Sequence, residues 1–177
     1  MCIRDSTQTL TAFFRACAIL KQRRPFTCII KGRETDGSAE RAQVEVVAQA
    51  TGFHNYRHVW GTIEAWLLSA EAVVACESNV FVQAMLLGTP AVNVWLPSSW
   101  IVGPAFGADD GVPLVPYDEP GRLAAVLDRL LSDQSFRTSV LQRMSAAATT
   151  FHVPLDGHSA RRCADFVTSR CKPIVRP

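Results

Sequence analysis

Short apolar runs and helically spaced apolar positions alternate along the chain and predict an α/β fold. Residues 72–76 and 91–95 are largely apolar runs of the kind found in strands covered on both faces. Between them the pattern changes to that of a short amphipathic helix, which Gly88 and Pro90 are suited to end. Residues 71–95 therefore predict a β-α-β unit, around which we expect the domain to be organised.

The same alternation continues on both sides of this unit. Further strands are predicted at residues 26–30, 44–48 and 112–115, helices at 10–23, 62–69, 122–131, 132–148 and 157–170, and loops at 34–40 and 96–108. A chain of 177 residues with 48% apolar residues can build one sizeable core. We expect a single α/β domain over residues 7–171, with a largely parallel sheet and helices on both faces, and a tail at residues 172–177.

The first six residues, MCIRDS, do not fit a native protein start. They resemble a translated assembly or adapter remnant, and they lack the basic start and apolar stretch of a signal peptide. We therefore leave residues 1–6 out of the fold prediction. If they are a remnant, the chain begins in the middle of a longer protein.

Charge and cysteine usage exclude several classes of function. The net charge is +2 and no basic stripe with interleaved aromatic residues occurs, which argues against a nucleic-acid partner. The apolar runs end well before the roughly 18 residues that span a bilayer, although attachment to a membrane surface stays open. Six cysteines without a Cys-x-x-Cys pair argue against a zinc site and favour a reducing cytoplasm.

The polar turn Glu77-Ser78-Asn79 is the first candidate site. It lies where a buried strand passes into a helix, and the first N–H groups of a helix and its dipole attract anions. Gln83 follows one helical turn later, where its amide could reach a hydroxyl of the ligand. The alternative is that Ser78 or Asn79 only caps the helix.

A second group of candidates follows the strand predicted at residues 26–30. Lys31 and Arg33 would lie at the carboxyl edge of the sheet, where ligands of open α/β sheets bind, or they are solvated loop charges. His54 and His58 lack a third metal ligand, so we expect no metal there, while contact of a loop histidine with substrate stays open. Asp109-Asp110-Gly111 predicts a turn, and Trp100 either stacks on a ligand or packs under its loop.

Two segments resemble a known superfamily. Residues 82–92, VQAMLLGTPAV, resemble the nucleotide-binding segment of the C-terminal domain of GT-B glycosyltransferases. Glu77-Ser78-Asn79 is closest to the branch of CDP-glycerol glycerophosphotransferases, capsule polysaccharide transferases and UDP-GlcNAc 2-epimerases. Phe151, Asp156-Gly157 and Arg162 resemble the Asp-Gly-x-x-x-x-Arg ending of the same branch.

The resemblance implies specific roles for the candidate residues. Ser78 and Asn79 would hold the phosphates of a nucleotide-diphosphate sugar or CDP-polyol donor, and Gln83 would hold its ribose in place of the family's carboxylate. Lys31 or Arg33 would assist, although KGRE stands here where the branch commonly has Lys-Pro-His-Pro. No metal ion and no cofactor is required.

The resemblance also implies an architecture and a function. The chain would be the Rossmann-like C-terminal half of a GT-B enzyme, acting in surface polysaccharide synthesis in the cytoplasm or at the inner face of the membrane. The acceptor and the general base belong to the N-terminal half, so we expect this fragment alone to be inactive. A UDP-GlcNAc 2-epimerase-like enzyme and a non-catalytic nucleotide-binding module remain the alternatives.

Overall fold

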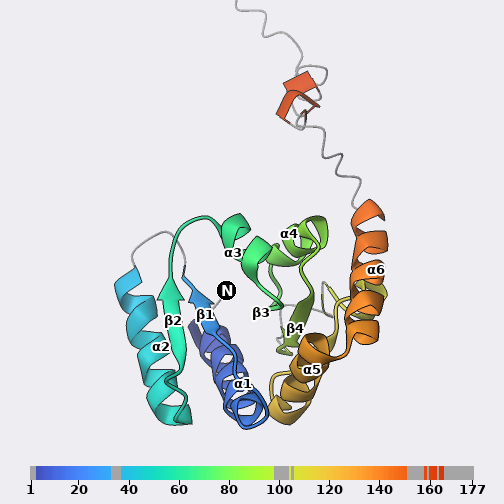
Figure 1. Cartoon of the computed structure of the whole chain (residues 1–177). Helices are drawn as coiled ribbons and strands as arrows, with labels where there is room; N and C mark the ends of the chain where they lie inside the picture. Colours follow the sequence, from blue (N-terminus) through green and yellow to red (C-terminus); the bar gives the residue numbers. More distant parts are fainter. Residues whose placement is uncertain are drawn as a thin grey trace, which may run out of the picture.

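Parallel strands alternate with helices through most of this computed structural model, which describes residues 3–32, 37–97, 104, 106–150, 158, 160–162 and 164–165 (Figure 1). The elements are α1 (Ile3–Lys21), β1 (Cys28–Lys31), α2 (Gly37–Thr51), β2 (Tyr56–Val59), α3 (Ile63–Ser69), β3 (Val73–Ala75), α4 (Val80–Leu87), β4 (Ala91–Trp95), the 3₁₀ turn η1 (Ala108–Asp110), β5 (Leu114–Pro116), α5 (Pro120–Ser132) and α6 (Gln134–Thr150). Residues 160–162 and 164–165 are also helical.

The strands form two small parallel sheets. β1 pairs with β2, with Cys28 opposite Tyr56, and β4 pairs with β3 on one side and β5 on the other. Val74 lies opposite Val92, and Asn93 opposite Leu114. β4 is the central strand of its sheet, which explains why its first four residues are fully buried.

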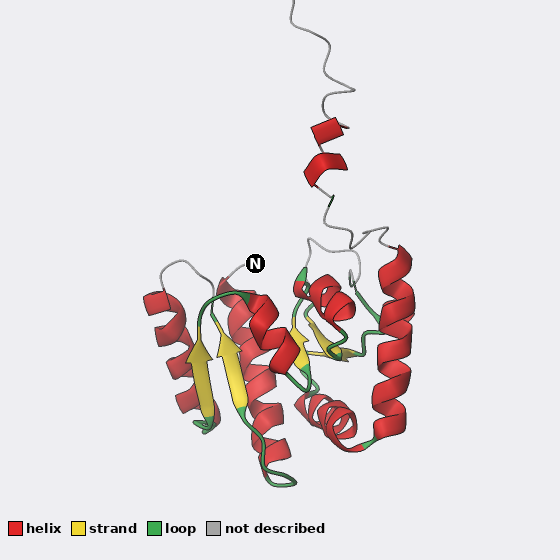
Figure 2. Ribbon diagram, turned by 45° about the horizontal axis from the view of Figure 1, so that its top comes forward, coloured by secondary structure: helices red, strands yellow, loops and turns green. Residues whose placement is uncertain are grey.

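Helices lie on two sides of these strands. α1 contacts α2 and α5, whereas α4 contacts α3 and α6. Figure 2 shows α1 and α2 behind β1 and β2, with α3 passing in front. Parallel strands covered in this way by connecting helices define a Rossmann-like α/β fold, as the sequence predicts.

Two apolar cores meet at α1. The larger one joins the β3–β4–β5 sheet to α4, α5 and α6, and α1 adds Ala12, Ala16 and Leu20 to it. The smaller one lies between α1, α2 and the β1–β2 pair, and α1 adds Phe14 and Cys17 to it. α1 therefore holds the two sheets together.

The strand predicted at residues 44–48 is wrong, because these residues lie inside α2. Val44, Val47 and Ala48 are buried at helical spacing, whereas Val46 is 67% exposed. An apolar run of this length fits a strand or a helix equally well, and packing against α1 decides for the helix. The strand that does pair with β1 is β2, which the sequence pattern does not predict.

The predicted β-α-β unit is confirmed. Strand, helix and strand occur as β3, α4 and β4, and Gly88 ends α4 in the left-handed conformation at φ 71°. α1 starts earlier than predicted and includes residues 3–6, so the helix continues into the segment that resembles a remnant. The helix predicted at residues 157–170 lies mostly outside the described residues. No helix in the described ranges has an apolar stretch long enough to cross a bilayer.

Candidate functional site

The turn between β3 and α4 carries the main candidate residues. β3 ends at Ala75, and the chain passes through Glu77, Ser78 and Asn79 before α4 begins at Val80. Glu77 has φ 40°, in the left-handed region that costs a non-glycine residue about 1 kcal/mol. Such a conformation persists only when its surroundings hold it.

Asn93 on β4 holds this turn. Its side chain is fully buried, and its Nδ2 donates to Glu77 Oε1 at 2.7 Å and to the carbonyl of Phe106 at 2.8 Å. The backbone N–H of Glu77 donates in return to Asn93 Oδ1 at 3.4 Å. The central strand thus fixes the turn in front of α4. The sequence prediction missed Asn93, although a lone polar residue inside an apolar strand could have marked it.

Ser78 and Asn79 differ at the start of α4. Ser78 Oγ accepts a hydrogen bond from the N–H of Val80 at 3.3 Å. Asn79 is the N-cap residue, but its side chain makes no capping bond. Ser78 is half-buried and Asn79 is exposed, so this corner is open to solvent. Ser78 therefore has a capping role whether or not a ligand binds.

Gln83 and the cations lie in different surroundings. Gln83 Nε2 donates a hydrogen bond to Glu64 Oε1 at 3.0 Å, and this bond joins α4 to the neighbouring helix α3. Lys31 ends β1, and its Nζ donates to the carbonyl of Gly32. Arg33 lies outside the described residues. Because helices return the chain between successive strands, Lys31 and Ser78 both lie at carboxyl ends of strands.

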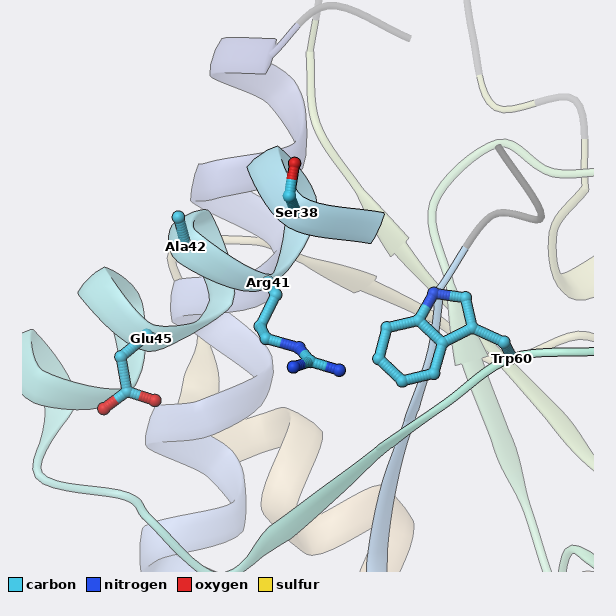
Figure 3. Close-up of a pocket in the computed structure, with 5 residues that line it drawn as sticks. All are labelled: Ser38, Arg41, Ala42, Glu45 and Trp60. Atoms are coloured by element: carbon cyan, nitrogen blue, oxygen red, sulfur yellow. The ribbon is translucent and has the colours of Figure 1, made fainter. Parts of the chain in front are cut away.

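A different part of the first sheet contains an open pocket of about 670 Å³, drawn in Figure 3. It lies between α2 and the residue that follows β2, and its lining residues are Ser38, Arg41, Ala42, Glu45 and Trp60. The Arg41 guanidinium lies over the Trp60 ring, 4.8 Å from its centroid. The sequence prediction did not bring these residues together, because the pocket needs the β1–β2 pairing that it missed.

His58 lies beside this pocket on β2. Its ring is 4.5 Å from the Trp60 ring, and both of its ring nitrogens are buried without a hydrogen-bond partner among the described residues. Burial lowers the pKa of His58; Glu40 raises it, and Arg41 lowers it further. The lowered pKa favours the neutral ring of His58, which carries one donor and one acceptor nitrogen.

Glu45 forms the far end of the pocket as an ordered carboxylate. Gln49 Nε2 donates to its Oε1 at 3.0 Å, and the Tyr56 hydroxyl donates to its Oε2 at 2.9 Å. The hydrogen bond from Gln49, followed by the one from Tyr56, lowers the pKa of Glu45. The pocket thus combines a guanidinium stacked on an indole ring with a fixed negative charge.

The remaining candidates are structural or untested. Asp110 Oδ2 accepts the N–H of Gly107 at 3.0 Å, which confirms the turn predicted there. Within the described ranges, no group of three or more histidine, cysteine or acidic residues could hold a metal ion. Trp100, Asp156 and Gly157 lie outside those ranges, and Arg162 is exposed.

No protein-family model and no curated protein matches this sequence. The fold is therefore established by the strand pairing and the helix packing alone. The roles of Glu77, Ser78, Asn79, Gln83, Lys31 and Arg33 stay predictions.

Proposed function

We propose that this chain is the donor-binding half of a GT-B-type glycosyl- or glycerophospho-transferase that acts in surface polysaccharide synthesis. One observation carries the proposal: a solvent-open polar turn, Glu77-Ser78-Asn79, stands at the carboxyl end of a parallel strand and at the start of a helix. Ligands of open α/β sheets bind at that edge. The buried amide of Asn93 supports the proposal further, because it holds the turn ready before any ligand arrives.

The donor's diphosphate would bind at the start of α4. The side chain of Asn79 is exposed and makes no capping bond, so it would donate to the diphosphate, and the helix dipole favours negative charge there. The N–H of Val80 bonds to Ser78 Oγ, and the N–H groups of Phe81 and Val82 bond to the carbonyls of Ser78 and Asn79. As the bond to the transferred group breaks, charge grows on the diphosphate, and fixed donors stabilise it. Lys31, at the end of β1, would add a positive charge. This chemistry uses neither a metal ion nor a cofactor.

Gln83 and Glu64 together would hold the ribose. An amide offers one acceptor oxygen, whereas a ribose has two neighbouring hydroxyls to donate. Glu64 Oε1 lies 3.0 Å from Gln83 Nε2, so a carboxylate stands next to the amide. The pair would present acceptors from two helices where the resembling family uses one carboxylate.

The acceptor and the general base would come from an N-terminal GT-B half, in the cytoplasm or at the inner face of the membrane. The replacement of a carboxylate by Gln83 favours a second candidate, a module that binds a nucleotide without turnover. A UDP-GlcNAc 2-epimerase-like enzyme would use the same turn. These candidates share donor binding, which is the step to test first.

Calorimetry with UDP-GlcNAc, CDP-glycerol and the corresponding monophosphates tests the proposal on the full chain. We expect one nucleotide-diphosphate ligand to bind, and Ser78→Ala with Asn79→Ala to weaken it about tenfold, the equivalent of roughly 1.4 kcal/mol. Ser38→Ala, a serine at the start of α2 in the other pocket, is the matched control and should change nothing.

Each failure has a separate meaning. Absence of binding to every one of these ligands would refute donor binding as such. Binding that Ser38→Ala weakens and the double variant leaves intact would move the site to the pocket beside Trp60. Turnover by the chain without a partner domain would contradict the expectation that this half is inactive alone.

A further inference from the structure

The two sheets meet at strands whose facing edges are unpaired. β1 pairs with β2 and β3 pairs with β4, and among the described residues neither β1 nor β3 has a partner on its other side. All three residues of β3 are only half-buried, whereas the adjoining β4 is fully buried over four residues. An inner parallel strand is normally covered on both faces and paired on both edges.

Helices cover the region between β1 and β3, which we call the junction of the two sheets. α1 supplies side chains to the cores of both sheets. In Figure 2, α1 lies behind the junction between β1 and β3, and α3 passes in front of it. A strand between β1 and β3 would therefore be covered by helices on both of its faces.

The handedness of the connections fixes where a strand before α1 would lie. α1 and α2 pack against each other on the same face of the β1–β2 pair. The connection from β1 through α2 leads to β2, and parallel crossovers are right-handed in about 98% of cases. A strand that leads through α1 into β1 must therefore lie on the side of β1 opposite β2, which is the side of β3.

Strand order gives the same answer. A doubly wound sheet has the order 3-2-1-4-5-6, in which the first strand separates the second from the fourth. The order here is β2-β1 and then β3-β4-β5, which matches that arrangement with the first strand left out.

We propose that the junction between β1 and β3 is the docking site of one further parallel strand, and that its occupant is an extended apolar segment joined directly to the start of α1. This strand would bond to β1 on one edge and to β3 on the other, and would unite the two sheets. Because both faces are covered, its side chains would be apolar and mostly β-branched. The inference concerns the fold and does not rest on the proposed function.

An N-terminal extension of the full chain tests this. Lys-Val-Ile-Val-Val-Gly-Ser is placed ahead of Ile3, and Lys-Ser-Gly-Ser-Ser-Gly-Ser is the length-matched control. Hydrogen exchange of single backbone amides is followed by NMR. We expect the apolar extension to slow exchange at least tenfold for amides of β1 and β3 that do not bond to β2 or β4, relative to amides of β5. The control extension should leave them unchanged.

Two results would overturn the proposal. One is equal exchange at β1 and β3 with both extensions, or slowing at the outer edges of β2 or β5 instead. The other is a concentration-dependent dimer of the original chain that protects the same edges, which would make a second copy the occupant. If the extended chain precipitates, the same apolar heptapeptide is added to the original chain. A rise in Tm with the apolar peptide alone then supports the docking site, and no rise refutes it.

Discussion

The side chain of Asn93 and the carboxylate of Glu77 form a 2.7 Å hydrogen bond that ties the central strand β4 to the turn before α4. Asn93 is fully buried, and its amide also bonds to the carbonyl of Phe106 and to the N–H of Glu77. One amide thus holds two loops at the carboxyl edge of the sheet. The geometry of Ser78 and Asn79 depends on it, because they follow directly after Glu77.

Asn93→Leu should destabilise the protein by about 1–3 kcal/mol, since it removes the hydrogen bonds of a buried amide to the carbonyl of Phe106 and the N–H of Glu77. Urea unfolding followed by circular dichroism measures the loss. Asn79→Leu serves as the control, because Asn79 is exposed and makes no capping bond. Equal midpoints for Asn93→Leu and the unsubstituted chain would contradict the anchoring role.

Ser78→Ala and Asn79→Ala should differ in stability without any ligand. Ser78 Oγ accepts the N–H of Val80, and loss of one such hydrogen bond costs about 1 kcal/mol. Asn79 makes no such bond, so its replacement should stay within about 0.5 kcal/mol. Thermal unfolding of both variants decides the point. A larger loss for Asn79→Ala would show that the cap is assigned to the wrong side chain.

His58 should make stability depend on pH. Burial lowers its folded-state pKa below the ordinary 6.5, so the unfolded chain binds the proton more tightly. The contribution of His58 to the free energy of unfolding is therefore fully present above pH 6.5. It is lost as the pH falls below that value toward the folded-state pKa. The charged groups that face it are Glu40, which opposes the shift, and Arg41, which adds to it.

Urea midpoints at pH 7.5 and 5.5 measure this effect. We expect the fall in midpoint to be smaller in His58→Gln than in the unsubstituted chain. His54→Gln is the matched control, because His54 is exposed, and it should keep the full fall. An unchanged pH dependence in His58→Gln would mean that other groups cause it.

Gly111→Ala should cost more than Gly52→Ala. Both glycines have positive φ, 74° and 68°, so alanine at either position costs about 1 kcal/mol in backbone strain. At Gly111 an added Cβ would also lie 2.5 Å from the backbone nitrogen of Met144 in α6, whereas at Gly52 nothing lies within 4 Å. We expect at least twice the loss at Gly111. If both variants lose the same free energy of unfolding, α6 moves away from the added Cβ without destabilising the protein.

Gln83→Glu should tighten binding of a nucleotide-diphosphate donor about fivefold, if the proposed function holds, because a carboxylate accepts more strongly than an amide. It would also place two carboxylates together, since Gln83 now bonds to Glu64. Glu64→Gln in the same chain removes that repulsion and should recover any lost stability. Calorimetry and thermal unfolding measure the two effects. Equal or weaker affinity in Gln83→Glu would count against the ribose role.

The local pattern of apolar and polar residues was sufficient to predict the secondary structure in the middle of the chain. The apolar runs that became β3 and β4, and the Gly88 and Pro90 that end the helix between them, predict the β-α-β unit without further information. The pattern failed for residues 44–48, whose valines fit a strand as well as a helix. It also failed for β2, Tyr-Arg-His-Val, which carries too little apolar alternation to be distinguished from a loop.

The sequence by itself determined the α/β class and placed a polar turn at the start of a helix, because both depend on residues close together in the chain. Only the tertiary structure decided that Asn93 anchors this turn, that Gln83 bonds to Glu64, and that β1 and β3 each have a strand partner on one edge only among the described residues. These relationships join residues that are distant in sequence. They follow from how helices and strands pack, which no local pattern of apolar and polar residues encodes.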